Sequence, residues 1–258
     1  MVLACLFDIR YRFGVNYPQK SHFIVNFKIL QHDVDIIFVH MPMNRFTILS
    51  FFTLLFGLIL CLLGYNMQAT WWVHTHGNRW ADGFFAWYTQ AAEWLLIILA
   101  MLLAFNISKR WGLIFFITGV LQALVVWAIK FGINAPRPAS IAMENIRKIE
   151  GVKLAFWQSF PSGHTAIGFL CYAIIGLAIT QQWQGNPTLG FTPKRLEKHN
   201  LTIEICLFIL AVGMGYSRMY LGQHSLLDVS IGGFIALAFF QSALICGKRW
   251  ISLVEKTN

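Results

Sequence analysis

Residues Tyr216 to Asp228, Tyr-Ser-Arg-Met-Tyr-Leu-Gly-Gln-His-Ser-Leu-Leu-Asp, place a cation, an imidazole and a carboxylate between two apolar runs. His224 and Asp228 are four residues apart, so on a helix they share one face, and the carboxylate can hold one ring nitrogen while the other stays available. Such an imidazole is a competent nucleophile or base. Arg218, six residues before His224, supplies a planar cation that can hold an anion such as phosphate. We therefore expect phosphoryl chemistry here.

Two other segments also carry groups that bind phosphate. In the first, Lys130 is followed after six residues by Arg137, which has a proline on each side. Prolines favour an extended, stiff backbone and so limit the positions that the guanidinium can reach. This segment is expected to present two cations to the same anion.

The second segment, residues 160–165, reads Phe-Pro-Ser-Gly-His-Thr and directly precedes a long apolar run. Proline, serine and glycine at this place suit a helix N-terminus, whose backbone N–H groups and positive dipole end can receive a phosphate. Ser162 adds a hydroxyl donor, and Gly163 lets the backbone approach closely. The segment predicts an anion site at the start of a helix.

Each segment alone is weak, because a Ser-Gly-His at a helix start is more often a cap and a His-x3-Asp is usually a satisfied hydrogen-bonded pair. Together, and in this order, they resemble the three-part signature of the type 2 phosphatidic acid phosphatase superfamily, the group of lipid phosphate phosphatases and vanadium haloperoxidases. The resemblance covers about residues 92–247. Its signature positions are Lys130, Arg137, Pro138, Pro161, Ser162, Gly163, His164, Ser217, Arg218, His224 and Asp228.

The resemblance implies a role for each group. His224 would attack phosphorus and form a phosphohistidine, Asp228 would orient it, and His164 would protonate the leaving oxygen and later activate water. The residues that would bind the phosphoryl oxygens are Lys130, Arg137, Ser162, Gly163 and Arg218. Three cations also reduce the need for a metal, and magnesium wants several carboxylate oxygens where this site offers Asp228 alone. We expect no metal and no other cofactor.

The composition predicts where these segments lie. The 258-residue chain is 57% hydrophobic and 12% charged, against about 25% charged residues in soluble domains. Apolar runs long enough to span a bilayer occur at 46–65, 92–107, 111–131, 164–181, 201–219 and 226–247. We therefore expect an all-α membrane bundle of six spans. The net charge of +9 is scattered among short loops, so nucleic acid is not an expected partner.

The distribution of lysine and arginine among the loops predicts the orientation. Thirteen of these cations fall before the first span, between spans two and three, between spans four and five, and after the last span. Both termini are therefore predicted to be cytoplasmic. The end of span three, the start of four, the end of five and the start of six then meet at the outer face. We expect a multi-pass inner membrane protein whose site faces the periplasm or exterior.

The expected organisation is an N-terminal segment of unassigned role (1–45), a first span with an aromatic interfacial loop (46–91), the catalytic core (92–247) and a cytoplasmic tail (248–258). Met41 or Met43 is a candidate biological start, because a short basic segment and a span follow. This aromatic stretch either forms a short interfacial helix that helps lipid substrates to approach or simply anchors the chain. His74 and His76 are spaced like metal ligands but lack further ligands nearby.

Some alternatives remain open. Arg147, Lys148 and Lys153 could contact a second phosphate or lipid headgroups, or lie in solvent. The predicted substrate is a lipid phosphate or diphosphate of the undecaprenyl diphosphate, phosphatidylglycerol phosphate or phosphatidic acid type. The rivals are a lipid A phosphatase and a lipid-to-lipid phosphotransferase using the same site. The spans argue against a haloperoxidase, and the complete signature argues against a transporter or scaffold with an inactive site. Oligomeric state is not predicted.

Overall fold

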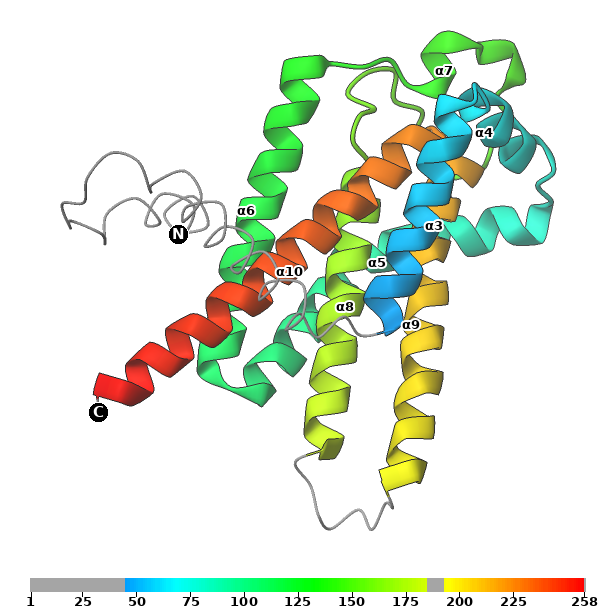
Figure 1. Ribbon diagram of the computed structural model, residues 1–258. Helices are drawn as coiled ribbons and strands as arrows, with labels where there is room; N and C mark the ends of the chain where they lie inside the picture. Colours follow the sequence, from blue (N-terminus) through cyan, green and yellow to red (C-terminus); the bar gives the residue numbers. More distant parts are fainter. Residues whose placement is uncertain (1–44, 185–192, 258) are drawn as a thin grey trace, which may run out of the picture. The chain divides into compact units, whose positions relative to one another are not determined.

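A computed structural model describes residues 45–184 and 193–257. Every regular element in these two ranges is helical, which confirms the predicted all-α class (Figure 1). The elements are α3 (Arg45–Leu62), α4 (Asn66–Thr75), α5 (Arg79–Ile107), α6 (Lys109–Ile133), α7 (Pro138–Ile141), the short 3-10 helix η2 (Met143–Asn145), α8 (Gly163–Gln184), α9 (Pro193–Tyr220) and α10 (Leu226–Thr257). The predictions about residues 1–44, including the start at Met41 or Met43, lie outside the described residues.

The predicted spans correspond to long apolar helices. Within the described ranges, five stretches are long and apolar enough to cross a membrane: Arg45–Leu62, Lys109–Ile141, Gly163–Thr180, Asn200–Tyr220 and Leu226–Gly247. The count becomes six if α5, which bends by 46° between Arg79–Gln90 and Trp94–Ile107, is one span. The predicted span 92–107 is thus the second half of a longer helix. The orientation of the termini stays a prediction.

The region predicted as an aromatic loop is largely helical, because α4 and the first half of α5 occupy most of it. Asn78 caps α5, with its side-chain oxygen accepting from the amide of Ala81 at 3.0 Å. Aromatic rings spaced four apart can then stack along the helix, as Phe84 and Tyr88 do with a centroid distance of 5.9 Å. The aromatic content was therefore compatible with a helix as well as with a loop.

Polar residues set the ends of the α5–α6 hairpin. The amide of Ser108 donates to Ala104 and ends α5, and its hydroxyl accepts from the amide of Trp111 at 3.1 Å and begins α6. One residue therefore serves as both caps and turns the chain back sharply. At its far end α6 stops at Asn134, which has the left-handed conformation (φ 47°) that asparagine tolerates.

Helix α8 is central to the compact unit Asn44–Ala243, which contains every candidate site residue. It packs against α5, α6 and α9. Of its apolar stretch Gly163–Thr180, 67% is buried, compared with 28% of α3. Figure 1 places the C-terminal ends of α6 and α9 and the N-terminal ends of α8 and α10 at the same end of this unit. The helices thus bring the three signature segments together.

Candidate active site

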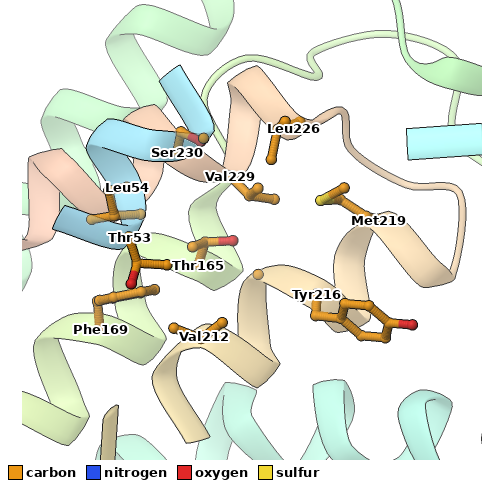
Figure 2. A pocket seen from close by; sticks show the side chains of 12 residues that line it. Thr53, Leu54, Thr165, Phe169, Val212, Tyr216, Met219, Leu226, Val229 and Ser230 are labelled. Carbon is orange, nitrogen blue, oxygen red and sulfur yellow. The ribbon is translucent and has the colours of Figure 1, made fainter. Parts of the chain in front are cut away.

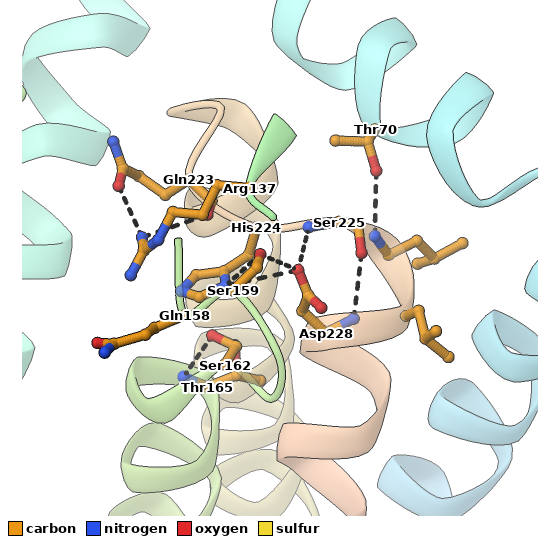
Figure 3. Close-up of polar contacts among 12 residues, drawn as sticks. Thr70, Arg137, Gln158, Ser159, Ser162, Thr165, Gln223, His224, Ser225 and Asp228 are labelled. Atoms are coloured by element: carbon orange, nitrogen blue, oxygen red, sulfur yellow. Dashed lines mark hydrogen bonds and ion pairs between the residues drawn. The ribbon is translucent and has the colours of Figure 1, made fainter. Parts of the chain in front are cut away.

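His224 and Asp228 face each other at the start of α10 (Figure 3). His224 Nδ1 lies 3.6 Å from Asp228 Oδ2 and 3.5 Å from Ser159 Oγ. The same carboxylate oxygen accepts from Ser159 Oγ at 2.6 Å and from the amide of Ser225 at 2.8 Å. The imidazole is 1% exposed and the carboxylate 4%. A buried, polarised imidazole therefore sits at the place predicted from the sequence.

The pair is not carried by one helix, as the four-residue spacing had suggested. Helix α10 begins at Leu226, after His224. Its start is fixed by Ser225 and Asp228: the Ser225 hydroxyl accepts from the Asp228 amide at 3.4 Å, while the carboxylate accepts from the Ser225 amide. This reciprocal arrangement is a capping box. Because the capping box fixes the N-terminus of α10 at Leu226, His224 lies in the turn before the helix. Its ring faces the Asp228 carboxylate from that turn.

The first backbone N–H groups of α10 all donate hydrogen bonds to other groups of the protein. Leu226 donates to the hydroxyl of Thr70 at 3.0 Å, and Leu227 donates to the side-chain oxygen of Asn66 at 2.8 Å. Both acceptors come from α4, and Figure 3 shows the contact from Thr70. The N-terminus of α10 is therefore closed by α4 and by its own capping box.

The backbone of Ser162, directly before α8, contacts α10. The amide of Ser162 donates to the carbonyl of Asp228 at 2.9 Å. A Cβ at Gly232 of α10 would lie 2.5 Å from the Ser162 carbonyl oxygen, so only glycine allows this approach. The Ser162 hydroxyl accepts from Thr165 at 2.9 Å and caps α8. The half-buried His164 follows in the first turn of α8.

Gly163 faces Lys130. A Cβ at Gly163 would have Val126 at 3.7 Å and Lys130 Cε at 3.8 Å as its nearest neighbours. These are ordinary van der Waals distances, so the protein's own packing does not demand glycine here. The Lys130 ammonium donates to the carbonyl of Gln158 at 2.7 Å and lies 3.4 Å from that of Ser159. Lysine, glycine and the segment before α8 therefore form one local group.

Arg137 is held by backbone carbonyls and by Gln223. Its Nε donates to Trp157 O at 2.9 Å, and its Nη1 donates to the side-chain oxygen of Gln223 at 2.9 Å. Gln223 directly precedes His224, so this contact joins the first signature segment to the third (Figure 3). The expectation that the guanidinium is restricted is met, and tertiary contacts reinforce the flanking prolines.

Arg218 approaches from α9. Its Nη1 donates to the hydroxyl of Thr89 at 3.0 Å, and its carbonyl accepts from the amide of His224 at 3.2 Å. The side chain is buried. Ser217, also in the signature, turns back onto its own helix, because its hydroxyl donates to Met214 O at 2.8 Å.

The surroundings of His224 favour its neutral form. Burial lowers the pKa of His224 most strongly, and the positive charges of Arg218 and Arg137 lower it further, against the opposing effect of Asp228. The imidazole is therefore neutral near pH 7, which leaves a nitrogen lone pair for attack on an electrophile.

Three contributors were missed by the sequence reasoning: Ser159, Gln223 and Thr89. Ser159 binds the catalytic carboxylate candidate, Gln223 binds Arg137, and Thr89 binds Arg218. Ser159 stands just before the Phe-Pro-Ser-Gly-His run and Gln223 just before His224, and these positions were the available signals. Thr89 lacks any local signal, because its partner Arg218 lies far away in the chain.

A second buried cluster lies beside the same turn and centres on His74 of α4. Its Nδ1 donates to Tyr220 O at 2.7 Å, and its Nε2 accepts from the amide of Arg147 at 2.8 Å. A carbonyl only accepts and an amide only donates, so the neutral Nδ1–H form is fixed. Burial lowers the pKa of His74 accordingly. Gly222 (φ 66°) packs on this ring, because a Cβ there would lie 3.1 Å from His74 Cε1.

Arg147 completes the second cluster. Its guanidinium forms two contacts with Asp82, at 3.0 and 3.3 Å, and donates to His74 O at 2.6 Å. Tyr220 Oη donates to the same carboxylate at 2.7 Å. Of the alternatives left open for this loop cation, the structure therefore places Arg147 in an ion pair rather than in solvent.

No group of three or more histidine, cysteine or acidic side chains that could hold a metal occurs among the described residues. His76, considered with His74 as a metal ligand, is exposed and bonds to Trp72 O at 2.8 Å. The two histidines thus have separate hydrogen-bond partners.

Two solved structures have a similar fold. LpxE from Aquifex aeolicus aligns with a TM-score of 0.53 and 23% identity over 69% of this chain and 94% of that one. The transmembrane PAP2-type phosphatidylglycerolphosphate phosphatase from Bacillus subtilis aligns with a TM-score of 0.58 and 20% identity over 80% of this chain and 98% of that one. No curated protein matches in sequence. The sequence profile of the PAP2 superfamily matches residues 110–251. This match covers more than half of the chain and includes all three signature segments, so the protein belongs to the PAP2 superfamily.

Proposed function

We propose that this protein is an integral membrane phosphatase that removes phosphate from a lipid phosphate or diphosphate at the extracytoplasmic face. The observation that carries the proposal is that hydrogen bonds join the three signature segments, which are distant in the chain, around His224. Arg137 bonds to Gln223, Ser159 bonds to Asp228, and the Arg218 carbonyl bonds to the His224 amide. The protein belongs to the PAP2 superfamily, and one structure of similar fold is a PAP2-type phosphatidylglycerolphosphate phosphatase. The apolar helices suit a substrate that stays in the bilayer.

In the first step, His224 attacks phosphorus. Asp228 and Ser159 both face Nδ1, so Nε2 is the attacking nitrogen. A P–N bond forms while the bond from phosphorus to the lipid oxygen breaks, and His164 gives its proton to that oxygen. Asp228 stabilises the positive charge that the ring acquires.

In the second step, neutral His164 takes a proton from water, and the resulting hydroxide attacks the phosphohistidine. The P–N bond breaks, inorganic phosphate leaves, and Nε2 regains its lone pair. Lys130, Arg137 and Arg218 offset the charge on the phosphoryl oxygens in both transition states. Loss of one such contact typically costs on the order of 3 kcal/mol.

The start of α8 is the proposed anion-binding helix end. The first N–H groups of α10 are occupied by Thr70, Asn66 and Ser225, which leaves α8, with Ser162 and Gly163, as the helix start that faces Lys130. Catalysis is proposed to be independent of metal. Asp228, the carboxylate of this site, already accepts from Ser159 and Ser225, so it is poorly placed to ligate a divalent cation as well.

The proposal is tested by measuring phosphate release from purified lipid phosphates in detergent, with excess chelator. Wild-type protein should release phosphate, His224→Ala should not, and His76→Ala, which changes an exposed histidine, should match wild type. Rapid quenching with labelled substrate should trap an acid-labile, base-stable phosphoenzyme in wild type alone. Activity that is lost in chelator and restored by one divalent ion would contradict the metal-independent mechanism.

The rival functions predict different products. A lipid-to-lipid phosphotransferase would give a phosphorylated acceptor lipid with little free phosphate. A lipid A phosphatase would release phosphate from lipid A in preference to phosphatidic acid, phosphatidylglycerol phosphate and undecaprenyl diphosphate. One panel containing all four lipids, with and without an acceptor lipid, separates these outcomes by product analysis.

A further inference from the structure

A cavity of about 250 Å³ lies among α5, α6 and α8. Its walls are apolar side chains such as Met101, Phe115 and Ile174. Phe116 and Val120 line it and are also exposed on the surface of the helices, so it reaches the face that a bilayer would cover. It exceeds the roughly 150 Å³ of an engineered cavity that admits benzene. A segment of hydrocarbon chain can therefore enter it sideways from the membrane.

One polar side chain, Gln122, lines this cavity. The residue is 1% exposed, and its Oε1 is buried without a hydrogen-bond partner. A buried unpaired acceptor is costly, and buried polar groups in native proteins normally have a partner. A lone water would be poorly held, because it needs two to four polar partners and the rest of this lining is almost entirely apolar. The unpaired oxygen therefore points to a donor on a ligand.

A second cavity has no such unpaired polar atom. Figure 2 shows a cavity of about 200 Å³ among α3, α8, α9 and α10. Thr165 and Ser230 are among its lining residues, yet no side-chain nitrogen or oxygen of that lining is buried without a partner. The Thr165 hydroxyl, for example, bonds to Ser162. Apolar space among these helices does not by itself leave a polar group unsatisfied.

The cavity that Gln122 lines and the candidate active site lie along the same faces of α6 and α8. On α6, Gln122, Val126 and Lys130 are spaced by four residues and share one face. Val126 and Lys130 are the nearest neighbours of Gly163 on that face. On α8, Ile167 and Ile174 of the lining follow His164 at three and ten residues, again on one face. Eight residues of helix separate Gln122 from Lys130, a rise of roughly 12 Å.

We infer that this cavity receives one hydrocarbon chain of the substrate and that Gln122 selects a lipid phosphate with a hydroxyl on that chain, roughly 12 Å from phosphorus. The inference rests on the proposed function. The hydroxyl donates to Gln122 Oε1 and satisfies the acceptor that a plain chain leaves unpaired. Discrimination of this kind arises because a site built to bond a hydroxyl rejects the analogue that lacks it.

The test compares phosphatidic acids that differ only in a hydroxyl, placed at increasing distances along one acyl chain, with the unsubstituted parent. For wild type, kcat/KM should peak at one hydroxyl position, roughly tenfold above the parent. Gln122→Leu should remove this peak and keep turnover of the parent. The thermal midpoint of that variant should equal or exceed that of wild type, because the unpaired amide is gone.

A second variant tests the cavity itself. A Cβ at Gly119, which lines it, would meet no atom within 4 Å, so the side chain in Gly119→Leu starts in open space and is expected to occupy the cavity. It should raise KM severalfold for long-chain lipids but not for a short-chain lipid phosphate that cannot reach the cavity. Gly132→Leu is the matched control on α6, because Gly132 also has open space but does not line the cavity.

Hydrolysis by wild type with equal kcat/KM across the hydroxyl series would overturn the role of Gln122 and leave the phosphatase proposal standing. A hydroxyl preference that survives in Gln122→Leu would also overturn the role of Gln122. Long-chain turnover that is unaffected by Gly119→Leu would overturn the role of the cavity. Failure of wild type to hydrolyse any lipid phosphate would instead overturn the proposed function and, with it, the assignment of this cavity.

Discussion

His224 and His74 are both buried beside the turn at Gly222, and they differ in how their ring nitrogens are used. His74 has a partner at each nitrogen, Tyr220 O and the amide of Arg147. For His224 the described partners, Ser159 and Asp228, both face Nδ1. The first imidazole is therefore a structural link between α4, α9 and the loop after η2. The second is oriented at one nitrogen and open to chemistry at the other.

This comparison teaches that burial and a lowered pKa do not by themselves identify a catalytic histidine. Both rings are almost fully buried, and burial is the largest cause of the lowered pKa of each. The distinction lies in the second nitrogen and in the nearby cations. Arg218 and Arg137 flank His224 and can hold an anion, whereas Arg147 beside His74 already has Asp82 as its counterion.

The largest expected effect is loss of turnover in His224→Ala, by at least about 10⁴-fold, since the proposed nucleophile is removed. Single-turnover phosphate release checks it, with the thermal midpoint measured in parallel. His74→Ala should behave in the opposite way, with residual turnover within about tenfold of wild type and a midpoint several degrees lower. Equal loss of turnover in both variants would break the distinction between the two rings.

Asp228→Asn should reduce kcat by about 10²- to 10⁴-fold, because the amide no longer stabilises an imidazolium and favours the wrong tautomer of His224. The measurement is kcat at saturating lipid phosphate. Ser159→Ala serves as the graded comparison, since it removes one hydrogen bond to the carboxylate and keeps its charge. A kcat for Asp228→Asn close to that of wild type would show that the carboxylate acts only as a helix cap.

In the cluster around His74, Arg147→Met should lower stability by on the order of 2 kcal/mol, because Asp82 and the His74 carbonyl lose the hydrogen bonds that Arg147 donates. The measurement is the shift of the thermal unfolding midpoint. The double variant with Asp82→Asn should lose less than the sum of the single changes, because the two side chains are in direct contact. Lys148→Met, a change of the adjacent cation, is the control and should leave the midpoint unchanged.

The smallest expected effect is the pH dependence that His74 contributes to stability. The folded protein keeps the ring neutral, whereas the unfolded chain takes up a proton below a pKa of about 6.5. The unfolded state then binds more protons, so the free energy of unfolding falls as pH decreases below that value, by up to about 1.4 kcal/mol per pH unit per histidine. Above pH 6.5 this contribution is fully present.

Stability measured between pH 7.5 and 5 checks this prediction. His74→Gln and His224→Gln should each reduce the slope by a similar amount, because burial lowers the pKa of both. His76→Gln, at an exposed position, should keep the wild-type slope. An unchanged slope in His74→Gln would mean that the folded state accepts a proton at this ring.

Residue type and order along the chain were enough to predict the all-α class, the apolar helices and the membership of the PAP2 superfamily. A helix that lies in a bilayer needs a continuous apolar run, so the predicted spans 111–131 and 226–247 fall within the apolar stretches Lys109–Ile141 and Leu226–Gly247. The bend in α5 could not be read, since its aromatic first half suited either a helix or an interfacial loop. The predicted span began at 226, where α10 begins, but the helical pairing of His224 with Asp228 was wrong, because Ser225 caps the helix and leaves His224 outside it.

The sequence by itself identified the groups that we propose do the chemistry, because cations, imidazoles and a carboxylate at the ends of apolar helices have few other uses. The tertiary structure alone decided which polar groups hydrogen-bond to neighbouring side chains. Thr89 reaches Arg218, Gln223 reaches Arg137, and Gln122 is left unpaired in a cavity. Such contacts join residues distant in the chain. They depend on how helices pack, and a hydrogen bond made or left unmade across a helix interface leaves no local pattern in the sequence.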